Sequence, residues 1–147
     1  MSFFGKLFGE GEQITSLTDK ESFVGILYAI IAADGEITNE EAQDFMTTCS
    51  RAKIMRSVNG NQWRDMIGKC HKVIKRQSAE ALVNLSIPNI PEDMKAGTFA
   101  YACDLVFADG HADPDEQKLL DIIKSGLNIS DELAYKVAEV VTIKNKL

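Results

Sequence analysis

The chain is poor in the residues that mark several classes of protein. It has three cysteines, Cys49, Cys70 and Cys103, with no CxxC pair, and an odd number cannot form a complete set of disulfides. Its two histidines, His71 and His111, are too few and too separate for a zinc site of four ligands. We therefore expect the cysteines to be buried, reduced thiols of a cytosolic protein.

Long apolar runs are also missing. No run approaches the roughly 18 residues that a membrane-spanning helix needs. Residues 1–8, which include Phe3, Phe4, Leu7 and Phe8, lack the continuous apolar stretch and cleavage site of a signal peptide. We predict a cytoplasmic protein without a transmembrane segment. The four apolar residues favour packing on the fold, with contact at the inner face of a membrane as the alternative.

A surplus of basic residues is absent as well. The 22 acidic residues outnumber the 16 basic ones and give a net charge of −6, which argues against nucleic acid as a partner. The local basic run Lys69, Lys72, Lys75 and Arg76 favours a solvated helix face over a patch for phosphate or anionic lipid.

Signatures of catalysis are missing too. The chain has no Ser/His/Asp or Cys/His pattern and no glycine-rich phosphate loop, so we predict that it is not an enzyme. The alternatives are a hydrolase that uses paired carboxylates and a thiol-based reductase, for which the three cysteines would be required.

What the sequence does contain is helical periodicity over almost its whole length. Its 147 residues suffice for one domain with a core, and no strand pattern competes. We predict an all-α, single-domain bundle of about seven helices. Five of them have a polar residue suited to cap the start, and in one of these a proline follows in the first turn: Thr18, Thr38, Ser78, Asp113 with Pro114, and Ser130. The first helix should stop at Asp34-Gly35, and Pro91 should lie in the first turn of the fifth.

One motif occurs twice. Residues 33–41 read ADGEITNEE and residues 108–116 read ADGHADPDE, and each copy follows an apolar segment. The two copies are offset by 75 residues (109 − 34 and 116 − 41). This repetition predicts a duplicated helical hairpin and an internal pseudo-two-fold repeat, with halves at about 18–86 and 91–147. Residues 1–15 would form a separate N-terminal segment and 16–147 the helical domain.

The matched acidic residues of the motif, Asp34, Glu41, Asp109 and Glu116, suggest a shared site. Asp34 follows Ile31 by three residues and Ile30 by four, so helical spacing places it on the face that points into the core, and we expect inward-leaning carboxylates. Capping boxes explain Glu41 and Glu116 equally well. They do not explain the aspartates, because a negative charge near a helix C-terminus opposes the macrodipole.

Carboxylates brought close together would require a bound cation or raised pKa values. Oxygen ligands select hard ions, so Ca²⁺ or Mg²⁺ is favoured over zinc. Neither copy of the motif is an EF-hand, because glycine directly follows the first aspartate and the glutamate stands at position eight of the loop instead of twelve.

The start Met1-Ser2-Phe3-Phe4, the doubled Ala-Asp-Gly-x5-Glu motif, the helical plan and the length together resemble the TerB-like domain family of tellurite-resistance proteins. The resemblance covers nearly the whole chain. It implies a seven-helix bundle that binds calcium through acidic corners and serves tellurium resistance and general stress response. By position it implicates the four matched carboxylates, with Glu40, Asp113 and Asp115 as outer ligands. It also implies protein partners, including a membrane-associated resistance complex. A metal-free helical interaction scaffold is the alternative.

Overall fold

The computed structural model describes residues 14, 16–108 and 110–147, and within these ranges the regular structure is entirely helical. The part of the chain described in this way contains seven α-helices: α2 (Asp19–Ile31), α3 (Asn39–Arg51), α4 (Gly60–Arg76), α5 (Ala79–Ser86), α6 (Lys95–Val106), α7 (Pro114–Gly126) and α8 (Asp131–Lys144). Three short 3₁₀ helices, η1 (Lys53–Met55), η2 (Ile87–Asn89) and η3 (Glu92–Met94), lie between them. The predicted all-α bundle is confirmed.

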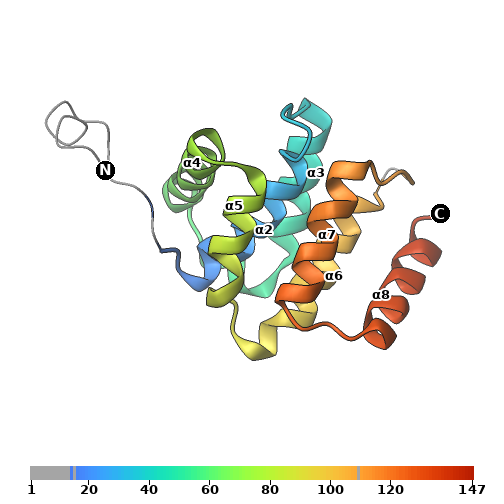
Figure 1. Cartoon of the computed structure of the whole chain (residues 1–147). Helices are drawn as coiled ribbons and strands as arrows, with labels where there is room; N and C mark the ends of the chain where they lie inside the picture. Colours follow the sequence, from blue (N-terminus) through green and yellow to red (C-terminus); the bar gives the residue numbers. More distant parts are fainter. Residues whose placement is uncertain (1–13, 15, 109) are drawn as a thin grey trace, which may run out of the picture.

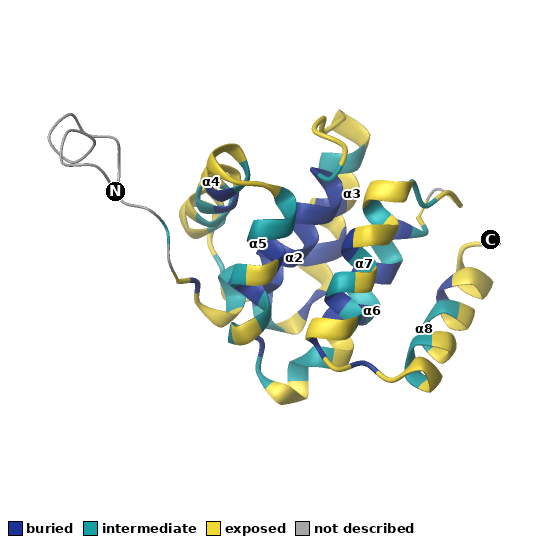
Figure 2. Ribbon diagram, viewed as in Figure 1, coloured by how far each residue is buried: buried dark blue, intermediate teal, exposed yellow. Residues whose placement is uncertain are grey.

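Helix α2 is the centre of the bundle. Every residue from Ser22 to Ile31 is buried, as expected of a helix that is apolar on all sides. Helices α3, α4, α5, α6 and α7 all pack against it, and Figures 1 and 2 show it enclosed by them. Phe45 of α3 continues this core by contacting Tyr28 edge-on and stacking on Trp63 of α4. The elements that carry the duplicated motif are thus anchored on one buried helix.

The helices begin where the sequence predicts. The Thr18, Thr38 and Asp113 side chains each accept a hydrogen bond from the backbone N–H three residues later, and the glutamate at that position bonds back to the cap. Ser78 and Ser130 also cap their helices. Asn59 forms a further capping box with Gln62 that the sequence interpretation did not include. Local hydrogen bonding therefore sets most of the helix boundaries.

Two predicted boundaries are wrong. Helix α2 ends at Ile31 and not at residue 34, because the backbone hydrogen bonds that follow join residues only three apart. The Ala33 N–H donates to the Ile30 carbonyl, and the Gly35 N–H donates to the Ala32 carbonyl. Helix α6 begins at Lys95, since η3 intervenes after Pro91. The first of these differences changes the position of Asp34, as described below.

The two copies of the motif form equivalent hairpins. Helix α2 ends 75 residues before α6 does, and α3 begins and ends 75 residues before α7. In both connections the glycine after the aspartate has a positive φ angle, 89° at Gly35 and 80° at Gly110, where a side chain would be strained. The predicted duplication therefore holds for the α2–α3 and α6–α7 hairpins. We call residues 32–41 and 107–116 the first and second acidic corners.

Helix α5 crosses α2 at close range. A Cβ atom added to Gly25 would lie 2.7 Å from Ser86 Oγ and 3.3 Å from Leu82 Cδ1. Ser86 itself is buried, and its hydroxyl donates a hydrogen bond to the Leu82 carbonyl. Glycine thus allows the closest approach between these two helices.

Helix α8 lies at the periphery and packs chiefly against α6 (Figure 1). Its end is held by an ion pair from Lys144 to Asp104 and by a 2.9 Å hydrogen bond from Asn145 Nδ2 to the Phe107 carbonyl. Tyr135, Val140 and Ile143 are exposed. Across the described ranges, every helix is too short or too polar to cross a membrane.

Candidate metal-binding corners

Asp34 lies in the turn of the first acidic corner and is exposed. Its Oδ1 accepts the Glu36 backbone N–H at 3.0 Å, the arrangement of an Asx turn. The prediction that Asp34 leans toward the core is wrong, because helical spacing from Ile30 and Ile31 does not extend beyond the end of α2. The charge of Asp34 therefore faces solvent.

Glu41 is half-buried in the first turn of α3. Its Oε1 accepts the Thr38 backbone N–H at 3.3 Å, and its own N–H donates to Thr38 Oγ1 at 3.1 Å. The capping interpretation of this residue is confirmed. Capping engages one carboxylate oxygen and leaves the second available to another ligand.

The second acidic corner repeats this cap. Glu116 N–H donates to Asp113 Oδ1 at 2.9 Å, and Asp113 N–H donates to Glu116 Oε1 at 3.4 Å. Gln117 Nε2 adds a hydrogen bond of 2.6 Å to the Ala112 carbonyl. His111 is exposed. Asp109, one of the four predicted ligands, lies outside the described residues.

The described carboxylates do not converge on one point. Apart from Asp109, which is not included, no three His, Cys, Asp or Glu side chains lie close enough together to hold a metal ion. Asp34, Glu41 and Glu116 therefore form no shared ligand group. Of the predicted outer ligands, Glu40 and Asp115 are exposed and Asp113 is half-buried and engaged as a cap.

The carboxylates of the first acidic corner are not neutralised by the described part of the protein. Ion pairs involve acids elsewhere, such as Glu21 with Lys69, Glu80 with Lys118 and Asp104 with Lys144. None involves the acids of the first corner or the following turn of α3, namely Asp34, Glu36, Glu40, Glu41 and Asp44. Among the described residues this corner is therefore a concentration of negative charge with no cation paired to it.

The three thiols are buried and free, as the sequence predicts. Burial raises the pKa of Cys70 and of Cys103 to about 12, and it raises the pKa of Cys49 further, with a contribution from nearby Cys70. All three are thus protonated near neutral pH. A thiol is a far weaker nucleophile than a thiolate, which weighs against the reductase alternative.

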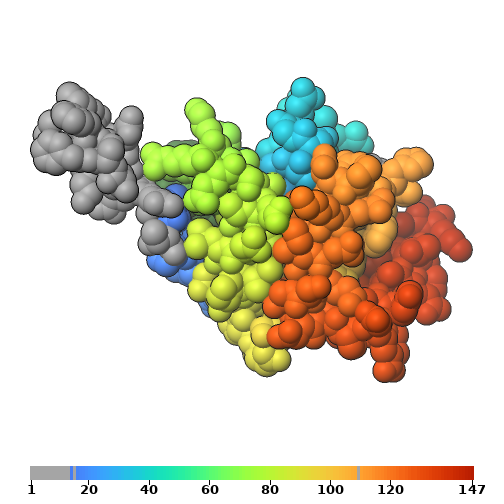
Figure 3. Space-filling view, viewed as in Figure 1, coloured from blue at the N-terminus to red at the C-terminus, as the bar shows by residue number. Residues whose placement is uncertain are grey.

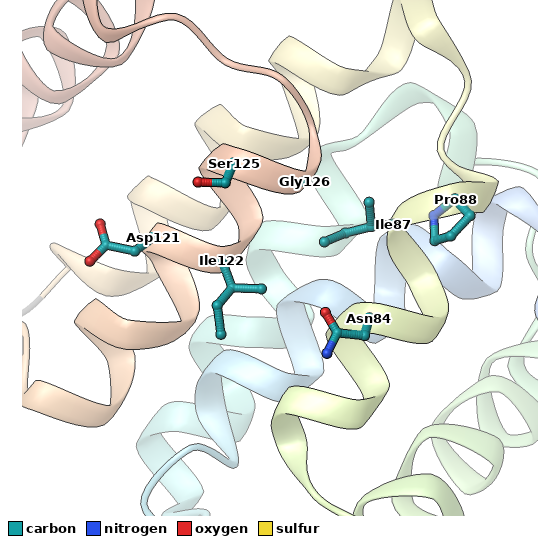
Figure 4. A pocket seen from close by; sticks show the side chains of 7 residues that line it. All are labelled: Asn84, Ile87, Pro88, Asp121, Ile122, Ser125 and Gly126. Carbon is teal, nitrogen blue, oxygen red and sulfur yellow. The ribbon is translucent and has the colours of Figure 1, made fainter.

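A shallow groove of about 570 Å³ lies between α5 with η2 and the second half of α7 (Figure 4). Ile87 and Ile122 face it, whereas the carboxylate of Asp121 points away from Ile87 (Figure 4). The acidic corners do not line this groove. Its mainly apolar wall has no convergent acid, base and nucleophile that would indicate catalysis.

Comparison of the chain with protein-family models, with curated proteins and with solved structures gives no match. The resemblance to the TerB-like family therefore rests on the sequence features alone and stays a prediction.

Proposed function

We propose that the protein is a non-enzymatic helical module of the tellurite-resistance, stress-response type, which acts through protein partners and binds Ca²⁺ at its acidic corners. The observation that carries the metal proposal is the unbalanced charge of the first corner, whose carboxylates have no cation beside them among the described residues. Hard cations such as Ca²⁺ and Mg²⁺ favour oxygen-only surroundings of this kind.

In the first corner, Asp34 and Glu41 would hold the ion through the carboxylate oxygens that do not take part in the Asx turn or the helix cap. Asp109 and Glu116 are their counterparts in the second corner. The outer ligands would be Glu40 in the first corner and Asp113 and Asp115 in the second. The ion would supply positive charge that lowers carboxylate repulsion. Since Asp34 is exposed, water would complete the ligand set, and we expect weak affinity, with a Kd on the order of 10⁻⁴–10⁻³ M.

Titration calorimetry of the chelator-treated protein with Ca²⁺ and with Mg²⁺ tests this proposal. We expect a heat of Ca²⁺ binding that the double variant Asp34→Asn/Asp109→Asn abolishes, because the variant removes one carboxylate from each corner. The matched control is Asp65→Asn/Asp121→Asn, which removes two exposed charges outside the corners. Absence of binding in the wild type, or equal binding in the corner variant, would contradict the proposal.

The second candidate is a metal-free interaction scaffold, favoured by the complete capping boxes of Glu41 and Glu116. If the corners are only caps, removal of divalent ions leaves the melting temperature unchanged. Thermal unfolding with and without chelator separates the two candidates, because Ca²⁺ that binds the folded state stabilises it by mass action. A Ca²⁺-dependent rise of several degrees would reject the metal-free scaffold.

A further inference from the structure

Helix α8 exposes several large apolar side chains. Tyr135, Val140 and Ile143 have exposed fractions of 77%, 64% and 59%. Within the described ranges, no large apolar side chain outside α8 exceeds 40%, apart from the final residue Leu147. Single exposed apolar residues are common on protein surfaces, whereas a group of them on one helix indicates a contact surface.

The opposite side of α8 attaches the helix to the fold. Val141 is buried there, and Ala134 and Val137 are half-buried. Figure 2 shows the half-buried residues of α8 on the side that faces the rest of the bundle, with exposed residues on the outside. Figure 3 shows the residues of α8 (red) at the edge of the molecule opposite α4 and α5 (green). The outer side of α8 is therefore open to a partner.

A shallow depression of about 540 Å³ runs along the outer side of α8. Its lining includes Tyr135, Glu139 and Lys146, so Lys146 lies on this side although it follows the end of the helix. Helical spacing adds the residues three and seven positions before Glu139. We define the outer face of α8 as the exposed residues Glu132, Tyr135, Lys136, Glu139, Ile143 and Lys146.

The outer face of α8 carries no net charge. It contains two acids, Glu132 and Glu139, and two bases, Lys136 and Lys146, whereas the whole chain has a net charge of −6. Two copies of the chain can therefore meet at this face with less repulsion than at their acidic surfaces.

The charges at the two ends of the outer face are available to a partner. Within the described residues, the Lys146 side chain has no ion pair or hydrogen bond, whereas Lys144, two residues earlier, pairs with Asp104 of α6. Glu132 pairs with Lys136 at 3.2 Å, but both are exposed, and exposed pairs of this kind contribute little to stability. Lys146 is thus an unpaired cation, and Glu132 can exchange its partner at small cost.

We propose that the outer face of α8 binds the same face of a second copy of the chain, with the two helices antiparallel about a two-fold axis at Glu139. In such an arrangement, residues equally far before and after Glu139 lie opposite each other. Glu132 and Lys146 are seven residues before and after it, so each Glu132 faces Lys146 of the second copy. Tyr135 and Ile143, four residues before and after it, form apolar contacts between these pairs.

The order of the charges selects a second copy in the antiparallel direction. Parallel helices would bring Glu132 to Glu132 and Lys146 to Lys146, and would also align like ends of the helix dipoles. A different partner would need its own matching order of acid, apolar residue and base, which a second copy supplies by symmetry. The two Glu139 side chains meet at the axis, where Lys136, three residues away, offsets part of their repulsion.

The size of α8 limits the strength of this contact. The helix has 14 residues, and at 1.5 Å per residue it is about 21 Å long. One face of such a helix offers less than the roughly 800 Å² per partner of a standard stable interface. We therefore expect a monomer at a few micromolar and a dimer toward millimolar concentrations.

Sedimentation equilibrium of the full-length protein from about 5 μM to about 1 mM tests this proposal. Chelator is present throughout, so that the result does not depend on metal binding at the acidic corners. Glu132→Lys and Lys146→Glu should each weaken the dimer by at least about tenfold, because each variant places like charges opposite each other twice. The double variant Glu132→Lys/Lys146→Glu should restore the dimer. An equimolar mixture of the two single variants should restore it too, because every facing pair is then again one acid and one base.

The matched controls are Asp65→Lys and Lys72→Glu, which make the same charge changes at exposed positions of α4. They should leave the dimer nearly unchanged. Tyr135→Ser should weaken the dimer without lowering the melting temperature of the monomer, since this side chain is exposed in the monomer. Glu139→Gln should strengthen the dimer several-fold, because it removes the repulsion at the axis.

A wild-type chain that stays monomeric at about 1 mM overturns the proposal and leaves the outer face of α8 to a different partner. Equal weakening by the α8 variants and the α4 controls would show a general effect of charge and also overturns it. A dimer that the mixture of the two single variants does not restore excludes the antiparallel pairing.

Discussion

The buried hydroxyl group of Ser22 is expected to lower the free energy of unfolding. Its hydroxyl is fully buried in α2 and has no hydrogen-bond partner among the described residues. An unsatisfied buried hydroxyl costs about 1–3 kcal/mol. Ser22→Ala should therefore stabilise the fold by about 1 kcal/mol and raise the melting temperature by about 2–4 °C.

Differential scanning calorimetry checks this expectation. Ser86→Ala is the comparison, because the Ser86 hydroxyl is equally buried but donates a 2.7 Å hydrogen bond to the Leu82 carbonyl. That variant should not be stabilised, since a hydrogen bond is lost. A lower melting temperature for Ser22→Ala would show that the hydroxyl makes a stabilising contact.

Single residues also show what local sequence can and cannot predict about the site. Glu41 and Glu116 were predictable as caps, because a capping box lies within four consecutive residues. Asp34 was misplaced because helical spacing was extended three residues past the true end of α2 at Ile31. The hydrogen bonds that end the helix are backbone contacts that side-chain periodicity does not reveal.

The packing of elements depends on glycine at the α2–α5 crossing. Gly25→Ala would place a methyl group 2.7 Å from Ser86 Oγ, and overpacking of this kind costs about 1–3 kcal/mol, more than the helix propensity that alanine adds. We expect a lower melting temperature for Gly25→Ala, with partial recovery in Gly25→Ala/Ser86→Ala.

The control for this packing effect is Gly68→Ala on α4. Outside the adjoining backbone of α4, no atom of the described residues lies within 4 Å of the added Cβ there, so this variant should be stabilised by up to about 1 kcal/mol through helix propensity. Thermal unfolding of the three variants separates packing from propensity. Equal stabilisation by Gly25→Ala and Gly68→Ala would contradict the close approach of α2 and α5.

At this scale the sequence predicted the helices well and their contacts poorly. Capping residues and proline positions are local, so most starts were found. The crossing at Gly25 and the groove between Ile87 and Ile122 arise from residues some 35 to 60 positions apart. One sequence without tertiary contacts does not reveal such pairs.

Across the whole molecule, stability should be uneven. Helix α2 is enclosed by five helices, whereas α8 packs chiefly against α6 and exposes Tyr135, Val140 and Ile143. Opening of α8 alone therefore exposes less apolar surface than global unfolding does. We expect its amides to exchange with deuterium at least tenfold faster than those of α2, which hydrogen-exchange mass spectrometry measures peptide by peptide. Equal protection of the two helices would contradict this.

The distribution of charge was only partly visible in the sequence. The run from Lys69 to Arg76 was interpreted as a solvated helix face, and Lys72, Lys75 and Arg76 are exposed in the structure. Arg64 lies on the same side of α4, eight residues before Lys72, and the fold brings Glu21 at the start of α2 to Lys69 of this helix. Whether carboxylates from the two corners meet also depends on helix packing, which no local pattern encodes.

The turn at Asp34 makes charge and shape separable in the first acidic corner. The left-handed backbone of Gly35 and an oxygen at position 34 that accepts the Glu36 N–H define the loop. Asparagine supplies the same oxygen without the charge. An Asp34→Asn variant therefore keeps the loop and removes only its electrostatic and ligand character, so a change in ion affinity can be attributed to coordination chemistry and not to a collapsed turn.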